Sequence, residues 1–285
     1  MPLADVIEGV EFPREPPITC PLCGSDHAPV RIAARFGMTA SVAECSSCRL
    51  AYQTPRPSDD ASRAYMNWRW SSDSRYVTDS PGKRRSARKK LRHVQSVHPQ
   101  PGALLDFGAG SGAFVHACLE SGWDAEGVER SEAAVARAQQ YYSVTLLDSI
   151  PDRTYDVITL WDVVEHLRDP VAILKELRSR LNDRGCLIME TGNWENWRRL
   201  VEGEDWGLYL LDHHYYFTPH SLETTAKRAG FSSLTLLDVN RKRPSLRRTL
   251  IEPSWGRRAW RAWRETRMRW PEHGDINVMI AIAAA

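Results

Sequence analysis

The sequence predicts an α/β fold, in which a parallel sheet carries helices on both faces. Apolar runs that end in an acid, such as 104–106 and 155–162, alternate with segments of helical spacing, such as 131–141 and 170–181. Regular alternation of this kind is typical of parallel sheets, whose ligands bind at the carboxyl ends of the strands. The 285 residues are 42% hydrophobic and 26% charged, which leaves ample material for a globular core.

A glycine-rich turn follows the first of these strands. The stretch LLDFGAGSG places Gly108, Gly110 and Gly112 before a helix expected at 113–119. Glycine lets a backbone turn sharply and approach a ligand closely, and the first turn of a helix offers free N–H groups. Residues 108–113 also fit the dinucleotide fingerprint G-x-G-x-x-A. The glycines therefore indicate a nucleotide cradle, but they do not separate a nicotinamide enzyme from other nucleotide binders.

Four acids are expected at the carboxyl edge of the sheet. Asp106 precedes the glycine turn, Glu129 ends the next strand 23 residues later, and Asp148 and Asp162 follow two further strands. A carboxylate at the position of Glu129 can accept both hydroxyls of a ribose. Four negative charges would repel a pyrophosphate, whereas they suit an adenosine that bears a cationic amino-acid tail.

These motifs, in this order, resemble class I S-adenosylmethionine-dependent methyltransferases. LLDFGAGSG is similar to that family's first motif, GVERS to its ribose-binding acid, YDVITLWDVVEHLRDP to its fourth strand and following helix, and GCLIMET to its fifth strand. The resemblance implies a Rossmann-like, doubly wound, mainly parallel seven-stranded sheet. It also implies that the cofactor is S-adenosylmethionine, held by Asp106, Gly108, Ala109, Gly110, Gly112, Glu129, Asp148 and Asp162.

Two cysteine pairs stand near the start of the chain. Cys20 and Cys23 form one C-x2-C pair, Cys45 and Cys48 form another, and 21 residues separate them. Four thiolates in this pattern suit the tetrahedral preference of Zn²⁺ and a closed structural site, although the gap is slightly longer than usual. Two disulfides or a redox pair are the alternatives, and a cytosolic chain disfavours them.

The cysteine pairs define the first of three expected parts. We expect a zinc ribbon at 1–57, a helical lid or linker at 58–98, and the cofactor-binding domain at 99–285. The run CPLCG to CSSCRLAYQTPRPS resembles a zinc-binding module that precedes some small-molecule and sugar methyltransferases. The ribbon either staples a short segment or helps to close the substrate pocket, and Tyr65 and Tyr76 in the lid are either substrate contacts or core.

Candidate bases follow the fourth and fifth strands. Methyl transfer from a sulfonium to a hydroxyl needs alignment and a base that removes the acceptor's proton. The segment DHHYYF resembles the E-H-x-x-Y-F stretch of the sugar methyltransferases, with Asp212 and His213 at the acid and base positions and Tyr216 at the aromatic position expected to contact substrate. His166 is the next candidate base. The alternative is a loop whose histidines and tyrosines only pack on the sheet.

Positive charge is concentrated in two segments. Residues 83–92 form a basic run, and residues 241–270 hold eleven Lys or Arg against two Glu. The second segment lies in an insertion expected at about 241–273, where tryptophans alternate with arginines. One interpretation is a binding segment, whose ligand is RNA, an anionic lipid surface, or a phosphorylated or nucleotide-linked substrate. The alternative is a structural segment, whose tryptophans dock on the domain while its arginines face water.

The leading interpretation is a methyltransferase that acts on a small molecule, with a hydroxyl of a sugar or natural product as the acceptor. An RNA methyltransferase that uses the ribbon and the basic segments, and a cofactor-binding partner without activity, are the alternatives. No signal peptide or membrane span is recognisable in the sequence, so a cytoplasmic location is expected. The patterns do not indicate an oligomeric state.

Overall fold

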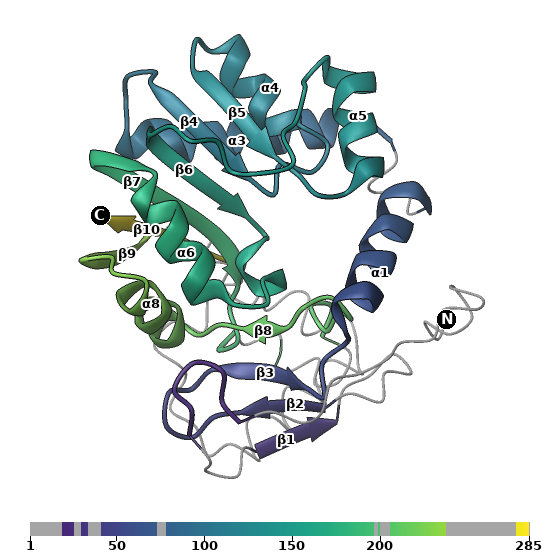
Figure 1. The fold of residues 1–285 in the computed structure, drawn as a ribbon, viewed down its shortest axis with the longest axis vertical. Coiled ribbons are helices and arrows are strands. Elements are labelled where there is room, and N and C mark those ends of the chain that lie inside the picture. The colour runs from purple at the N-terminus through teal and green to yellow at the C-terminus, as the bar shows by residue number, and fades with distance from the viewer. Residues whose placement is uncertain are drawn as a thin grey trace, which may run out of the picture. The chain divides into compact units, whose positions relative to one another are not determined.

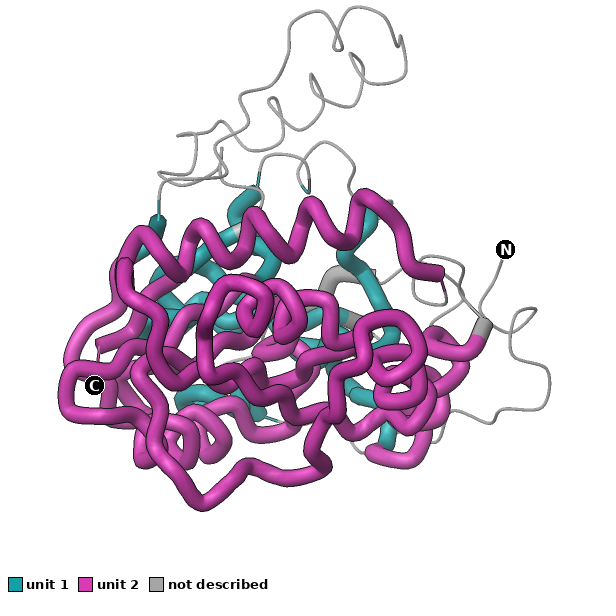
Figure 2. The backbone as a smooth tube through the Cα atoms, turned by 90° about the horizontal axis from the view of Figure 1, so that it is seen from above, with its two compact units in different colours: residues 1–58, 191–224, 236–280 teal, residues 59–190, 225–235, 281–285 magenta. Residues whose placement is uncertain are grey.

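The computed structural model describes residues 19–25, 30–33, 41–72, 78–196, 199, 206–237 and 278–284. Contacts between Cα atoms divide the chain into two compact units (Figure 2). The first comprises residues 1–58, 191–224 and 236–280, and the second comprises 59–190, 225–235 and 281–285. The three expected parts, with boundaries after 57 and 98, stay a prediction. The basic insertion at about 241–273 lies outside the described residues.

A four-stranded antiparallel sheet organises the first unit. Its order is β1 (Val30–Ala33), β2 (Ser41–Glu44), β3 (Ala51–Thr54) and β8 (Tyr215–Tyr216). Ala51 pairs with Tyr216 across β3 and β8. Ala51 and Tyr216 share one buried cluster with Trp194 and other aromatic side chains. This cluster supplies the unit with apolar burial, which a sheet of such short strands needs for stability.

The second unit is built around a six-stranded sheet of order β5-β4-β6-β7-β10-β9 (Figure 1). Its strands are β4 (Ala103–Phe107), β5 (Asp124–Val128), β6 (Tyr155–Trp161), β7 (Leu181–Gly192), β9 (Ser233–Leu237) and β10 (Val278–Ala284). Its helices are α1 (Asp59–Ser72), α3 (Pro81–Val97), α4 (Ala113–Glu120), α5 (Glu132–Tyr142), α6 (Pro170–Ser179) and α8 (Pro219–Arg228), and a short 3-10 turn is η2 (Val164–His166). The boundary between the units divides β7, β9, β10 and α8.

The sheet confirms the predicted α/β class. Strands β5, β4, β6 and β7 run parallel to one another, and α6 lies in front of the sheet while α3 lies behind it in Figure 1. Strand β10 lies between β7 and β9. The strand expected before Asp148 is a single parallel bridge between Leu147 and Val128, so the sheet has six assigned strands where seven were expected.

Local signals explain where the helices begin. Ser80 accepts a hydrogen bond from the N–H of Lys83 at the start of α3, and Asp169 does the same for Ala172 at the start of α6. Such caps satisfy N–H groups that the helix itself leaves without partners. Within the described part of the chain, none of the helices has the length and apolar character that a bilayer crossing requires.

Candidate functional site

The two cysteine pairs adopt matching turns in the first unit. The carbonyl of Cys20 accepts the N–H of Gly24 at 2.8 Å, and the carbonyl of Cys45 accepts the N–H of Arg49 at 2.9 Å. Gly24 and Arg49 therefore occupy equivalent positions, and both have positive φ, of 70° and 60°. Positive φ is costly for a residue with a Cβ, so Arg49 is held there by the turn around it.

The four thiols converge on one point. Their sulfur atoms lie within 4.8 Å of one another, with 3.5 Å between Cys20 and Cys48 and 3.6 Å between Cys23 and Cys45. A tetrahedral zinc with bonds of about 2.3 Å would space its sulfurs by about 3.8 Å. All four cysteines are free thiols, so the alternative of two disulfides is not formed. The donor set and its spacing fit zinc.

The thiols differ in how easily they ionise. Burial raises the pKa of Cys20 to about 11. Burial also opposes ionisation of Cys45, but the backbone N–H groups of Cys48 and Ser47 outweigh it and lower the pKa of Cys45 to about 7. A cation among the sulfurs would remove the cost of the remaining ionisations, because metal ligands bind as thiolates.

The glycine turn of the second unit has the geometry that its sequence predicts. Gly108, Gly110 and Gly112 all have positive φ. A Cβ on Gly108 would lie 2.5 Å from the side chain of Val163, and one on Gly110 would lie 2.9 Å from the ring of Trp70. The N–H groups of Gly108 and Ala109 bond to the carbonyl of Val128 on the neighbouring strand. Only glycine fits these positions, because the side chains of Val163 and Trp70 pack where a Cβ would lie.

Glu129 lies directly against this cradle. One carboxylate oxygen accepts the N–H of Gly110 at 2.9 Å, and the other accepts the N–H of Ser131 at 2.8 Å. The two bonds hold the carboxylate at the end of β5 with lone pairs left for a ligand. Ser131 also caps α5, so one short turn both starts the helix and orients the acid.

Asp106 is buried at the end of β4. Its side chain is 2% exposed and accepts a hydrogen bond of 2.7 Å from the hydroxyl of Thr159 on β6. Burial raises the pKa of Asp106 to about 7, against the opposing effects of the Thr159 bond and the charge of Lys90. A positively charged ligand would restore the carboxylate form, because an opposite charge favours ionisation.

Lys90, on α3, is a site residue that sequence reasoning missed. Its ammonium lies 3.8 Å from a carboxylate oxygen of Glu190 and 5.1 Å from the centre of the Trp161 ring. Glu190 is the last residue of β7 that belongs to the second unit. Burial raises the pKa of Glu190, and the positive charge of Lys90 opposes that rise. Lys90 lies within a run of seven basic residues, so nothing in the sequence alone distinguished it.

Trp161 adds a hydrogen-bond donor near the same edge. Its side chain is 7% exposed, and within the described residues its indole N–H has no acceptor. A buried donor without a partner costs free energy, which a bound acceptor would recover.

The remaining two acids lie at the surface. Asp148 is exposed and accepts a hydrogen bond from the hydroxyl of the neighbouring Ser149. Asp162 is also exposed, has a φ of 57°, and donates its N–H to the carbonyl of Glu190. Their part in holding a cofactor stays a prediction.

Helix α1 reaches the cradle from the expected lid segment. Asn67 accepts a hydrogen bond from the hydroxyl of Ser131 at 3.1 Å, and Trp70 lies against Gly110. Tyr65 is 4% exposed and stacks on Trp68 at 5.9 Å. Its predicted substrate contact stays a prediction, and Tyr76 lies outside the described residues.

The candidate bases fall in different units. Asp212, His213 and Tyr216 belong to the first unit and are 2%, 7% and 3% exposed. The rings of His213 and Tyr216 are 6.0 Å apart, and burial raises the pKa of Tyr216 well above its usual value. His166 ends η2 in the second unit. The catalytic roles of these residues stay predictions.

Comparison with protein families places the central part of the chain. Residues 80–236 match the family model described as a methyltransferase domain. A ubiquinone biosynthesis O-methyltransferase of Bradyrhizobium diazoefficiens is 26% identical over 149 residues, which cover 48% of this chain and 57% of that protein. The corresponding enzyme of Psychrobacter arcticus is 27% identical over 158 residues, which cover 48% and 62%. The chain thus spans about three fifths of these curated relatives.

Solved structures share the fold at low sequence identity. A SAM-dependent methyltransferase of Archaeoglobus fulgidus aligns with a TM-score of 0.50 and 18% identity, over 71% of this chain and 94% of that one. The magnesium protoporphyrin IX methyltransferase of Synechocystis, with bound SAH, aligns with a TM-score of 0.50 and 16% identity, over 78% and 94%. At this identity the likeness establishes the fold alone.

Proposed function

This chain belongs to the methyltransferase domain family, and we propose that it transfers a methyl group from S-adenosylmethionine to a small-molecule acceptor. The observation that carries the proposal is the edge of the sheet in the second unit. There a bare glycine turn adjoins Glu129, and the buried Asp106 has a raised pKa that a cationic ligand would lower. A dinucleotide would bring a pyrophosphate toward these acids and be repelled.

The residues of this edge fit the parts of the cofactor. When bound, S-adenosylmethionine supplies the methyl group from its sulfonium. Glu129 accepts the ribose hydroxyls, because its carboxylate is already oriented beside the cradle. Asp106 faces the cationic amino group, and Lys90 attracts the carboxylate of the amino-acid tail. A Cβ at Gly108 or Gly110 would displace Val163 or Trp70, so these glycines keep the turn, and the Glu129 carboxylate bonded to it, in place beside the ligand.

We infer that the acceptor is a hydroxyl of a sugar or natural product. Two curated relatives are named as O-methyltransferases, which supports oxygen as the atom that is methylated. His213 removes the acceptor's proton, and the neighbouring Asp212 raises its basicity and holds its tautomer. His166 is the alternative base. Tyr216, Tyr65 and Tyr76 are the candidate substrate contacts.

The cysteine module holds a structural zinc in this proposal. Four protein ligands close a tetrahedral site and leave no position for substrate. Its role is to fix the turns at Cys20–Cys23 and Cys45–Cys48, on which the short strands of the first unit depend.

Replacing His213 by Ala tests the catalytic part of the proposal. Purified protein is incubated with labelled S-adenosylmethionine and a panel of sugar nucleotides and phenolic natural products, to find the acceptor. With that acceptor, His213→Ala should lower kcat by about 10² or more, because general-base catalysis contributes at least that factor. The Kd of the cofactor, measured by calorimetry, should change less than about twofold.

His220→Ala is the matched control, because His220 is an exposed histidine of the same unit. Unchanged turnover in both variants would reject His213 as the base. Cofactor binding without turnover of any acceptor in the panel would instead favour a binding partner without activity.

A further inference from the structure

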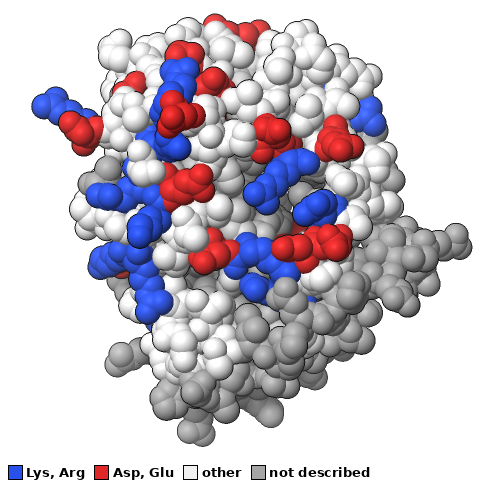
Figure 3. All heavy atoms as spheres, viewed as in Figure 1, with Lys and Arg blue, Asp and Glu red and all other residues white. Residues whose placement is uncertain are grey.

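Helix α3 carries positive charge that the methyltransferase site does not use. The helix contains seven Lys or Arg and no Asp or Glu among its 17 residues. On the face shown in Figure 3, by contrast, basic and acidic side chains are interspersed. Lys90 points to the cofactor edge, as its contact with Glu190 indicates, so the unexplained charge lies on the exposed side of the helix.

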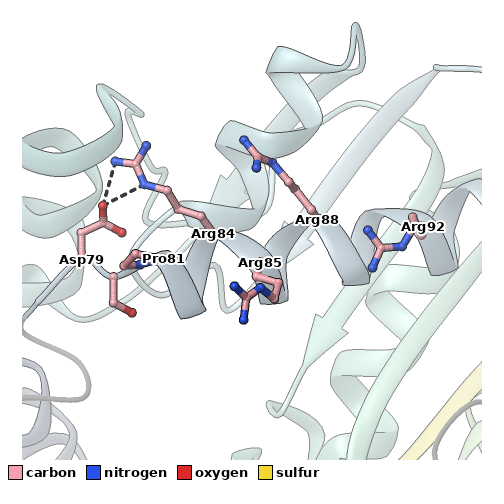
Figure 4. A pocket seen from close by; sticks show the side chains of 7 residues that line it. Asp79, Pro81, Arg84, Arg85, Arg88 and Arg92 are labelled. Atoms are coloured by element: carbon pink, nitrogen blue, oxygen red, sulfur yellow. Dashed lines mark hydrogen bonds and ion pairs between the residues drawn. The ribbon is translucent and has the colours of Figure 1, made fainter.

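Four arginines on that side line a hollow of about 500 Å³ together with residues at the start of the helix. Arg84, Arg88 and Arg92 follow one another at intervals of four residues, about 6 Å along the axis for each step, and Arg85 lies beside them. Figure 4 shows the guanidinium groups spread along the hollow, with Arg84 joined to Asp79. We call these four residues the arginine groove.

The one acid of the groove is already engaged. Arg84 donates to Asp79 through two bonds of 2.9 and 2.7 Å, and Asp79 also accepts from the hydroxyl of Tyr142. Within the described part of the chain, Arg85, Arg88 and Arg92 make no ion pair with a carboxylate. Among the described residues, these three guanidinium groups of the groove therefore have no counter-charge.

This arrangement is unfavourable for the helix itself. Like charges four residues apart repel one another, and cations in the first turn oppose the helix dipole. The helix forms because Ala87, Leu91 and Val94 are buried and Ser80 caps its first turn, not because of its arginines. Residues that destabilise their own helix without improving its packing are expected where those residues serve a function. The arginines of α3 fit that description.

We propose that the arginine groove binds the diphosphate group of a small ligand, at a site separate from the methyl-transfer site. Guanidinium forks match phosphate oxygens, and several together favour a group with more than one charge. Among the residues that the structure describes, the lining contains no aromatic ring on which a nucleic-acid base could stack. The apolar residues of α3 are buried against the domain, so the helix offers no apolar face to a bilayer.

Calorimetry with inorganic pyrophosphate tests this site directly on the full, zinc-loaded chain. We expect pyrophosphate to bind with a Kd of about 100 µM or below at 50 mM salt, and more weakly as salt rises. The variant Arg85→Gln with Arg88→Gln and Arg92→Gln should weaken binding at least about tenfold. Its melting temperature should stay equal or rise, because the substitutions remove repulsion.

The matched control replaces Arg63, Arg137 and Arg184 by Gln, which removes the same charge elsewhere on the second unit. This variant should retain pyrophosphate affinity within about twofold, as surface charges beyond a Debye length are screened. Equal weakening in both triple variants would overturn the proposal, since it would show a response to net charge alone. Binding of single-stranded RNA or of anionic vesicles with no binding of pyrophosphate would also overturn it and assign the groove to a macromolecular surface.

Discussion

The cysteine module of the first unit and the acid edge of the second unit are two candidate binding sites built in opposite ways. In the module, each pair of ligands is positioned by one turn of five residues, closed by a bond between the first Cys and the residue four positions later. At the acid edge, Asp106, Glu129 and Lys90 come from β4, the end of β5 and α3. A local turn can be recognised in a sequence, whereas convergence at a sheet edge depends on strand order and register.

In both regions, burial opposes the ionisation of acidic groups. Each gathers groups that become negative on ionisation, and burial raises the pKa of Cys20 to about 11 and that of Asp106 to about 7. A bound cation would favour the ionised form of the groups in each region. In the cysteine module that cation is a metal ion, and at the acid edge it is the positively charged cofactor. The comparison therefore predicts that the first region needs its cation in order to fold, while the second folds without it and needs it only for function.

Removal of one thiolate should have the largest effect. Cys45→Ser should reduce bound zinc from about one per chain to nearly none, and should unfold the first unit, because structural zinc contributes roughly 10 kcal/mol or more to the folding of such modules. Metal analysis and thermal melting measure the two effects. Cys186→Ala, which removes a half-buried thiol outside the module, should keep the zinc. Stoichiometric zinc in Cys45→Ser would contradict the four-cysteine site.

Addition of a single methyl group to the cradle should have an intermediate effect. Gly108 and Gly122 have nearly equal φ, of 82° and 83°, but a Cβ on Gly108 meets Val163 at 2.5 Å while one on Gly122 meets nothing within 4 Å. Gly108→Ala should raise the Kd of S-adenosylmethionine by roughly 30-fold or more, a cost of about 2 kcal/mol. Gly122→Ala carries the same backbone strain and should leave that Kd nearly unchanged. Equal effects of the two substitutions would show that strain, and not the cradle, controls binding.

A change of pH should have the smallest effect. The folded chain holds a proton on Asp106 that the unfolded chain releases, so this group's contribution to stability falls as pH rises from about 4 to about 7 and is constant above. A bound cation would expel the proton, so cofactor affinity should increase by about tenfold between pH 6 and pH 8. Calorimetry in two buffers of different ionisation enthalpy measures the proton release. The increase should disappear in Asp106→Asn, and an identical pH profile in that variant would assign the titration to another group.

Much of the fold could be predicted because its signals are local. The acid after each apolar run, the glycine turn and the helical spacing at 131–141 and 170–181 correspond to β4, β6, α5 and α6. The strand expected before Asp148 is shorter than its sequence pattern indicated. An apolar run that ends in an acid does not determine how many of its residues pair with a neighbouring strand. One bridge, from Leu147 to Val128, is what forms.

The candidate site was less predictable. All four acids looked equivalent in the sequence, yet Asp106 is buried and bonded to Thr159 while Asp148 and Asp162 are exposed. Lys90 was hidden among other basic residues, and Trp70 was one aromatic of several in the lid. Burial and electrostatic environment arise from neighbours that are distant in the chain, and a linear pattern does not contain them.

The sequence by itself determined the α/β class, the cysteine pairs, the glycine turn and the order of acid-ended strands, because each of these depends on residues within a few positions of one another. Only the tertiary structure decided that Asp106 is buried, that Lys90 lies beside Glu190 and that three arginines of α3 have no counter-charge among the described residues. Those properties follow from packing between elements, such as α3 against α4 and β4 beside β6, and packing joins residues that the chain itself keeps apart.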